Sequence, residues 1–345
     1  MLGRLFRREN LTSQEAAAAL DSVLAGEANP GQLAAFVAAL RTKGETVEEI
    51  TGFVSARRAR AEPLVIAGEL VDTCGTGGDR SGTINVSTIS ALVVAGAGAK
   101  VCKHGNRAAS SDAGSADVFE ALGVVVDLGP AGVERCLRDV GIGFCLATRF
   151  HPAMRHAAPV RSQLGVVTVF NFLGPLANPA HAGRQLIGVG DPEMAERMLA
   201  VLEANGTTHA MVVFGHDGLD ELTTVTTSTV LETVRVTDDG PSYRRSTYDV
   251  DPRALGLAPA QLSDLVGGAP ARNAELAIAV LTGEVGPRRE FVLLNAGAAL
   301  VVAGLVDDLR SGIELAASVV DSGAAAAALQ RLVTASQSAA TDGLM

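Results

Sequence analysis

Two glycine-rich polar runs contain the residues of this chain best suited to hold phosphate groups. They are CGTGGDRSGTINVST at 74–88 and KHGNRAASSDAGS at 103–115. Glycine lets backbone N–H groups approach a ligand because no Cβ intervenes, and such loops can surround phosphate oxygens. The second run adds two cations, Lys103 and Arg107. Together the two runs predict a site for a strongly anionic ligand.

A strand and a helix are expected to position the first run. The stretch 64–71 is apolar enough for a buried strand, and 86–96 has the composition of a helix opened by NVST. The first turn of a helix carries unpaired N–H groups and the positive end of the dipole, so Asn85, Ser87 and Thr88 are expected beside an anion. GxxxxGK[ST] and GxGxxG spacings are absent from the sequence. This argues against a mononucleotide P-loop and a Rossmann site, and a plain strand-to-helix turn stays the alternative.

Two adjacent carboxylates, Asp220 and Glu221, follow the apolar stretch MVVFG in GLDELTT. Ligands of parallel sheets bind beyond the carboxyl ends of the strands, where this pair would lie. Carboxylate oxygens are the ligands that Mg²⁺ prefers. The pair therefore predicts a magnesium site, with a solvated turn as the alternative interpretation.

Composition limits the class of protein. The 345 residues, 48% of them hydrophobic and 19% charged, predict a globular protein with room for two domains. A net charge of −10 argues against nucleic-acid binding. The longest apolar runs fall short of the roughly 20 residues of a membrane helix, so no membrane span is expected. The four cysteines show no CxxC spacing and no signal peptide is evident, which predicts a cytoplasmic protein with reduced thiols.

The order of predicted elements indicates an α/β fold with a small helical domain in front. Residues 1–63 contain three helix starts, at Thr12, Asn29 and Thr46. From 64 to 335, short Val-rich runs alternate with helical stretches, which predicts a largely parallel central sheet flanked by helices. Further strands are expected at 100–103, 124–128, 142–147, 210–215 and 291–295, a helix at 316–328, and a disordered tail at 336–345.

The motifs CGTGGD, NVST, KHGNR, PVRSQLG and GLDELT occur in the order found in anthranilate phosphoribosyltransferases, and the chain resembles that family over nearly its whole length. The resemblance implies transfer of the 5-phosphoribosyl group from phosphoribosyl pyrophosphate to the amine of anthranilate, in tryptophan biosynthesis. It also implies Mg²⁺, with two ions, and a homodimer formed through the N-terminal helices. A segment near 153–176 would cross back to the helical domain, with the site in the cleft between the domains.

The resemblance also assigns residues to each ligand. Phosphoribosyl pyrophosphate would contact Gly75, Gly78, Asp79, Thr83, Asn85, Val86, Ser87, Thr88, Lys103, His104, Gly105, Asn106, Arg107, Ala108, Ala109, Ser110, Ser111 and Ser115. Anthranilate would contact Gly75, Asn106 and Arg161, and magnesium Ser87, Asp220 and Glu221. No acid or base is assigned, because an aromatic amine is neutral at pH 7 and catalysis by positioning and charge neutralisation is expected.

Several positions leave alternatives open. Arg161 can pair bidentately with a carboxylate, or can form a structural salt bridge. His104 and His151 are candidate lining residues of the acceptor site. Asp79 cannot attract a bare phosphate, so we expect it to meet a ribose hydroxyl, a metal-bound water or a backbone N–H.

Two positions depart from the pattern of the family. Asp112 adds a negative charge beside the phosphate site, and Val167 replaces an arginine. Pyrimidine nucleoside phosphorylases and a non-catalytic nucleic-acid-binding relative are the alternative functions. The intact KHGNR and GLDELT motifs argue against the first, and the acidic composition against the second.

Overall fold

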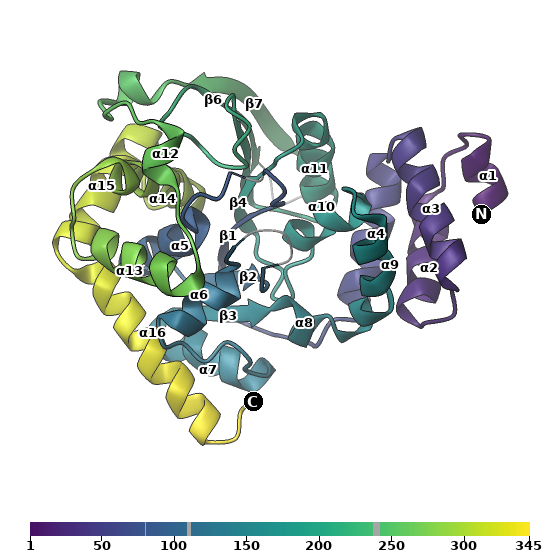
Figure 1. Ribbon diagram of the computed structural model, residues 1–345, viewed down its shortest axis with the longest axis horizontal. Coiled ribbons are helices and arrows are strands. Elements are labelled where there is room, and N and C mark those ends of the chain that lie inside the picture. Colours follow the sequence, from purple (N-terminus) through teal and green to yellow (C-terminus); the bar gives the residue numbers. More distant parts are fainter. Residues whose placement is uncertain (80, 109–111, 237–241) are drawn as a thin grey trace.

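Four helices form a separate group at the N-terminal end of the chain (Figure 1). The computed structural model describes residues 1–79, 81–108, 112–236 and 242–345. The helices of the group are α1 (Leu2–Phe6), α2 (Ser13–Leu24), α3 (Pro30–Lys43) and α4 (Val47–Ala59). Thr12, Asn29 and Thr46 each begin a helix with a capping box, as the sequence predicts.

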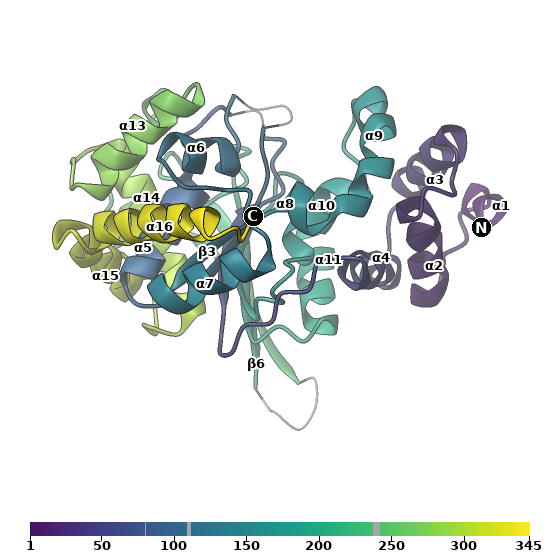
Figure 2. The same ribbon diagram turned by 90° about the horizontal axis from the view of Figure 1, so that it is seen from below.

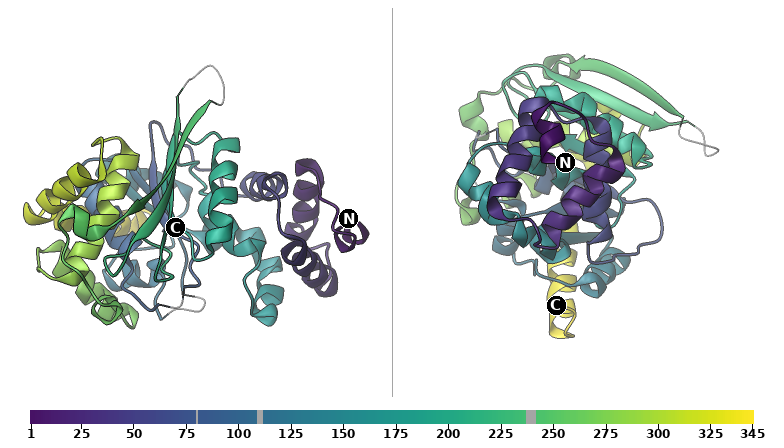
Figure 3. Two further views of the ribbon diagram at one scale, coloured as in Figure 1. Left: turned by 90° about the horizontal axis from the view of Figure 1, so that it is seen from above. Right: turned by 90° about the vertical axis from the view of Figure 1, so that its right-hand side faces the viewer.

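A seven-stranded sheet forms the centre of the rest of the molecule. Its strands are β1 (Val71–Gly75), β2 (Val101–Gly105), β3 (Ile142–Leu146), β4 (Arg184–Gly188), β5 (His209–Gly215), β6 (Ser228–Arg235) and β7 (Tyr243–Val250). They lie in the order β3-β2-β1-β4-β5-β6-β7. The first five are parallel, and β6 and β7 pair antiparallel at one edge, where they project as a long hairpin (Figure 3). The predicted, largely parallel sheet is confirmed.

Helices cover both faces of this sheet. On one side lie α5 (Val86–Gly96), α7 (Pro130–Val140), α14 (Pro287–Ala303), α15 (Leu309–Asp321) and α16 (Ala324–Thr341), and on the other α11 (Pro192–Ala204). Shorter helices are α6 (Ser115–Ala121), α8 (Ala147–Phe150) and α12 (Leu262–Leu265), with α13 (Pro270–Leu281) and a 3₁₀ turn at Pro252–Leu255 beside them. Successive residues of β4 and β5 point to opposite faces, so Leu186 and Met211 join one hydrophobic core while Ile187 and Ala210 join the other.

The predicted crossover segment is helical and packs against the N-terminal helices. It consists of a 3₁₀ helix (Pro152–His156), α9 (Ala158–Leu164) and α10 (Val169–Leu176). Figure 2 shows α9 and α10 on the side of the sheet that faces α3 and α4. Val160 and Phe170 belong to the same buried core as Ile50 of α4. One core therefore joins the N-terminal helices, the crossover and one face of the sheet.

Three of the predicted strands need correction. The first strand begins only at Val71, and 64–70 belongs to no strand. In the stretch 124–128 the side chains of Val124, Val126 and Leu128 are buried, but it pairs with no strand among the described residues. Residues 291–295 lie in α14, which is buried on nearly all sides, so its apolar run carries no helical periodicity that could have distinguished it from a strand.

The C-terminal tail is also more ordered than predicted. Helix α16 continues to Thr341, and Ser336 and Ala339 are fully buried along it. The expected helix at 316–328 is two helices, because Gly323 adopts a left-handed φ of 77° between α15 and α16. Within the described ranges, no single helix is long and apolar enough to cross a membrane. Only α15 and α16 taken together reach the length and composition of a membrane span, and the two helices are bent by 65° relative to one another.

Candidate active site

The glycine loop that follows β1 folds across the carboxyl end of the sheet. Gly77 and Gly78 have φ values of 65° and 92°, which glycine adopts without steric cost. The N–H of Thr76 donates to the carbonyl of Gly188 in β4 at 2.9 Å. The N–H of Gly77 donates to Oδ2 of Asp220 at 2.7 Å. The first run is thereby tied to the carboxylate pair that lies 143 residues further along the chain.

The second half of this loop is fixed by other parts of the chain. Ile84 donates its N–H to the carbonyl of Leu265 at 2.9 Å, and Thr83 forms an isolated β-bridge with Val266. The Asn85 amide donates to the carbonyl of Ala113 at 3.0 Å and accepts from Asn273 at 2.7 Å. Asn85, predicted as an anion ligand, is therefore also the link between the two glycine-rich runs.

Helix α5 places the polar residues of NVST in different environments. Ser87 lies at the loop, while Thr88 is fully buried and its hydroxyl has no hydrogen-bond partner among the described residues. The N–H of Val86 donates to the carbonyl of Ile84 and the N–H of Thr88 to that of Asn85. Of these side chains, Ser87 is the one placed to reach a ligand in the loop.

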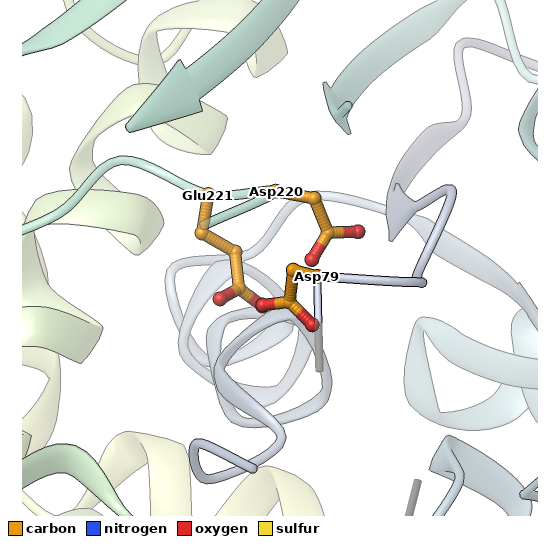
Figure 4. Close-up of side chains that lie close together, drawn as sticks. All are labelled: Asp79, Asp220 and Glu221. Carbon is orange, nitrogen blue, oxygen red and sulfur yellow. The ribbon is translucent and has the colours of Figure 1, made fainter. Parts of the chain in front are cut away.

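Three carboxylates meet at the end of the sheet (Figure 4). Asp79, Asp220 and Glu221 each bring one oxygen to within 4.8 Å of the other two. Asp220 is only 6% exposed. Burial, together with the charge of Asp79, raises the pKa of Asp220 to about 7. Burial and the charges of Asp220 and Asp79 hold the pKa of Glu221 well above its usual range. The cluster therefore concentrates negative charge that the protein itself leaves poorly compensated.

Neighbouring residues fix the positions of Asp220 and Glu221 in GLDELT. Asn295 of α14 donates to the carbonyl of Leu222 at 2.8 Å and accepts from its N–H at 3.1 Å, which holds the residue next to Glu221. A Cβ on Gly75 would lie 2.3 Å from Oδ2 of Asp220, and one on Gly188 would lie 1.5 Å from the carbonyl oxygen of Asp220. Strands β1 and β4 must therefore end in glycine for Asp220 to lie across them.

The buried side chain of Lys103 contacts both β1 and the first turn of α5. Its ammonium group donates to the carbonyl of Thr73 and to Oγ of Ser87 at 3.3 Å, and the residue is 1% exposed. Burial lowers the pKa of Lys103, whereas the nearby charge of Asp72 opposes the shift. Asp72 in turn accepts from the N–H of His104 at 3.1 Å and from Asn178 at 2.8 Å. The Lys103 ammonium and the Asp72 carboxylate are thus both buried, and each favours the charged form of the other.

The second glycine-rich run turns at Asn106. The Asn106 carbonyl accepts from the N–H of Ala116 at 3.1 Å and from Oγ of Ser115 at 3.4 Å. Arg107, predicted to bind phosphate, instead pairs with Glu120 at 2.7 Å and Asp117 at 3.2 Å. A ligand would have to compete with these carboxylates for the guanidinium.

The remaining predicted residues of the second run follow the same turn. Gly105 ends β2, and a Cβ there would lie 2.1 Å from Oγ of Ser115. Ala108 donates its N–H to Asp117 at 2.8 Å. The predicted contacts Ala109, Ser110 and Ser111 lie outside the described residues.

Of the predicted acceptor residues, Arg161 lies on α9, and His104 and His151 are hydrogen-bonded to the crossover segment at Gly174 and Ala177. The Arg161 guanidinium lies 5.5 Å from the ring centre of Phe170, and burial lowers its pKa. Among described residues it has no carboxylate partner, so the alternative of a structural salt bridge finds no support there. The rings of His104 and His151 lie 5.2 Å apart. Of the two departures from the family pattern, Asp112 is exposed and Val167 is 41% exposed.

Sequence reasoning missed a further cation in this region. Arg57 of α4 is buried, although the SARRAR segment reads as an ordinary charged helix end. The signal was its spacing: Ile50, Phe53, Val54 and Arg57 recur at helical intervals, so Arg57 shares the buried face. Asn178, Asn273 and Asn295, which position other site residues, carry no comparable local signal.

The carboxylate cluster fits a magnesium ion. Its ligand atoms are the hard oxygens that Mg²⁺ prefers, and Oε2 of Glu221 is buried with no hydrogen-bond partner among the described residues. A divalent cation would offset the repulsion that raises the carboxyl pKa values.

Comparison with known families assigns both parts of the chain. A family model described as "Glycosyl transferase family, a/b domain" matches residues 67–326, and one described as "Glycosyl transferase family, helical bundle domain" matches residues 1–61. The chain is 51% identical over 334 residues to the anthranilate phosphoribosyltransferase of Roseiflexus castenholzii, covering 96% of each chain. The chain belongs to this glycosyl transferase family and, within it, to the anthranilate phosphoribosyltransferases.

Solved structures agree with this assignment. Anthranilate phosphoribosyltransferase from Thermus thermophilus superposes with a TM-score of 0.90 at 42% identity, covering 97% of this chain and 99% of that one. The Saccharomyces cerevisiae enzyme in complex with phosphoribosyl pyrophosphate and Mg gives 0.87 at 27% identity, covering 98% and 97%. The same yeast enzyme with 4-fluoroanthranilate gives 0.86 at 26% identity, with the same coverage.

Proposed function

We propose that the protein transfers the 5-phosphoribosyl group from phosphoribosyl pyrophosphate to the amine of anthranilate. The observation that carries this proposal is the direct hydrogen bond between Gly77 of the glycine loop and Asp220 of the carboxylate cluster. It brings backbone donors for phosphate and carboxylates for a metal ion to one end of the sheet. That combination suits a pyrophosphate that leaves as a metal complex.

On the donor side, the two glycine-rich runs hold phosphoribosyl pyrophosphate. Gly75, Gly78 and Thr83 supply the first loop, and Asn106 with Ser115 the turn that Asn85 joins to it. Lys103 contributes a fixed positive charge below the loop, which neutralises negative charge on the donor. Arg107 contributes to a lesser degree, because its guanidinium is already paired with Glu120 and Asp117.

Magnesium supports the same step, and we propose two ions. Asp220 and Glu221 would hold one of them, with the Asp79 carboxylate beside them, and Ser87 would contribute to the other. When bound, Mg²⁺ supplies charge neutralisation for the pyrophosphate group as it leaves. The protein's own contribution is to keep the carboxylates together through Asn295 and the glycines that end β1 and β4.

The acceptor binds with its carboxylate at Arg161 and near Asn106 and Gly75. The amine nitrogen forms a bond to the anomeric carbon while the bond from that carbon to pyrophosphate breaks, and the amine then releases one proton. The neutral aromatic amine has its lone pair available at pH 7, so the residues described here position it and need not deprotonate it first. The products are N-(5-phosphoribosyl)anthranilate and pyrophosphate, in tryptophan biosynthesis.

We also propose that the enzyme is a cytoplasmic homodimer associated through its N-terminal helices. The largely exposed Phe6 at the end of α1 supports an apolar contact on that surface. Analytical ultracentrifugation of Phe6→Glu and of the unaltered protein tests this interface. We expect the variant to sediment with a lower mass than the unaltered protein, and equal masses for the two proteins would contradict the interface.

Loss of anthranilate fluorescence tests the reaction itself. The protein is mixed with anthranilate, phosphoribosyl pyrophosphate and Mg²⁺, with controls that lack each component and a parallel reaction with thymidine and phosphate. We expect magnesium-dependent loss that requires both substrates, and no thymine release. A folded protein that binds phosphoribosyl pyrophosphate but leaves anthranilate unchanged would contradict the proposed acceptor.

A further inference from the structure

Arg57 is a buried cation without a counter-charge in the described part of the chain. It lies on the inner face of α4 and is 6% exposed. Its Nε is fully buried without a hydrogen-bond partner, and no carboxylate among the described residues forms an ion pair with it. Buried charges in proteins are normally paired, so an isolated guanidinium in this position needs a physical explanation.

The neighbouring histidines do not supply the missing charge. A carbonyl oxygen can only accept, so Nδ1 of His104 donates to Gly174 at 3.1 Å and Nε2 of His151 donates to Ala177 at 3.0 Å. The opposite nitrogen of His104, Nε2, is buried without a partner in the described structure, and the His151 ring faces the backbone carbonyl of Arg57. Burial lowers the pKa of His104 to about 3 and that of His151 to about 2, so both rings are neutral.

The charge of a second guanidinium, that of Arg161, acts on Arg57. Burial, reinforced by the charge of Arg161, lowers the pKa of Arg57 to about 9, which still leaves the group protonated at pH 7. The region thus contains two cations and two neutral imidazoles, with no carboxylate paired to either arginine among the described residues. An anion from outside the chain would satisfy both arginines.

We propose that Arg57 is a second carboxylate-binding residue of the acceptor site, acting together with Arg161. The inference rests on the proposed function and adds a residue to its acceptor site: the anthranilate carboxylate would meet two guanidinium groups. Two guanidiniums can hold the carboxylate from two sides and fix the direction in which the amine points. Phosphate groups of the donor are the competing anion, and the experiment separates the two.

Arg57→Met is the informative variant, because it removes the charge and retains an apolar side chain. We expect the KM for anthranilate to rise roughly tenfold or more, the loss typical of a hydrogen bond between charged groups, while the KM for phosphoribosyl pyrophosphate stays within about twofold. Arg57→Lys should recover part of the affinity. The melting temperature of the ligand-free variant should be equal or higher, because an unpaired buried charge is gone.

Arg58→Met is the matched control. Arg58 is the next residue of the same helix, and its guanidinium donates to the carbonyl of Leu176 at 2.9 Å, which gives it a structural role. We expect this variant to melt at a lower temperature and to keep its KM for anthranilate. The opposite changes in stability and affinity distinguish the two arginines.

Calorimetric titration with benzoate and with aniline provides a readout that does not depend on turnover. Benzoate should bind the unaltered protein more tightly than aniline, and Arg57→Met should remove most of that difference. An unchanged KM and unchanged benzoate binding in Arg57→Met would overturn the inference, as would a rise confined to the KM for phosphoribosyl pyrophosphate. Inactivity of the unaltered protein with intact benzoate binding would instead count against the proposed reaction.

Discussion

Replacing Asp220 by asparagine should stabilise the metal-free protein while it removes magnesium-dependent activity. The Asp220 carboxyl is buried next to Asp79, and its pKa is raised from 3.8 to about 7. Between these two values the native state holds a proton that the unfolded state has released. The free energy of unfolding of the unaltered protein therefore falls as the pH rises towards 7, by about 1.4 kcal/mol for each pH unit.

The variant lacks this titration, so the stability difference between the two proteins should depend on pH. The interval from pH 5 to the Asp220 pKa of about 7 is two pH units. Between pH 5 and pH 8, the free energy of unfolding of Asp220→Asn should therefore rise by about 3 kcal/mol relative to that of the unaltered protein. The asparagine oxygen can still accept from Gly77, so the loop anchor is retained. Coupling to Glu221 spreads the titration over both groups without changing its sign.

Urea unfolding of both proteins at pH 5 and pH 8, in EDTA, measures this difference. Asp112→Asn, which changes an exposed carboxylate, is the control and should shift the free energy by less than about 0.5 kcal/mol at either pH. Added Mg²⁺ should stabilise the unaltered protein more than Asp220→Asn. A stability difference that is constant with pH, or that favours the unaltered protein in EDTA at pH 8, would refute the account of the carboxylate cluster.

Two further substitutions test other parts of the site. Gly188→Ala places a Cβ 1.5 Å from the carbonyl oxygen of Asp220. It should abolish magnesium-dependent turnover and lower the melting temperature by several degrees. Gly174→Ala is the control, because its Cβ meets nothing within 4 Å, and it should change neither property. Normal turnover by Gly188→Ala would show that the position of Asp220 is unimportant. Lys103→Met should destabilise the protein by roughly 3 kcal/mol, because Asp72 loses its counter-charge, and should lower kcat/KM for phosphoribosyl pyrophosphate about a hundredfold. Chemical denaturation and steady-state kinetics at varied donor concentration measure these effects, and a change in stability alone would leave Lys103 with a purely structural role.

The local pattern predicted those elements whose own residues determine them. Helix α5 occupies 86–96 as expected, because a polar opening precedes a continuous apolar stretch. The capping boxes fixed the starts of α2, α3 and α4 in the same way. Strands β2, β3 and β5 lie within one or two residues of their predicted positions. In each case the signal lies within a dozen residues of the chain.

Elements that depend on distant partners were predicted poorly. The run 291–295 looks like a strand by composition, and only its burial between the sheet and the outer helices accounts for an apolar helix there. The segment 124–128 has the alternating burial of a strand, with Val124, Val126 and Leu128 inside, but it pairs with no strand in the described structure. Strand β7 is exposed along most of its length, so it lacks the apolar alternation by which strands are found.

The site shows the same division. The motifs placed the glycine loop and the pair Asp220 and Glu221 at the same end of the sheet, and the structure brings them into contact. The pairing of Arg107 with Glu120 and the burial of Arg57 depend on how helices pack, which no single motif contains. Residues that share a motif were therefore easier to place than residues whose partners depend on helix packing.

Direct identification of the products tests the central claim most closely. The protein is incubated with anthranilate, phosphoribosyl pyrophosphate and Mg²⁺, and the mixture is separated and analysed by mass spectrometry while pyrophosphate is assayed in parallel. We expect N-(5-phosphoribosyl)anthranilate and pyrophosphate in equal amounts, and we expect EDTA to abolish both. Pyrophosphate release without a phosphoribosylated anthranilate, or product formation that is insensitive to EDTA, would contradict it.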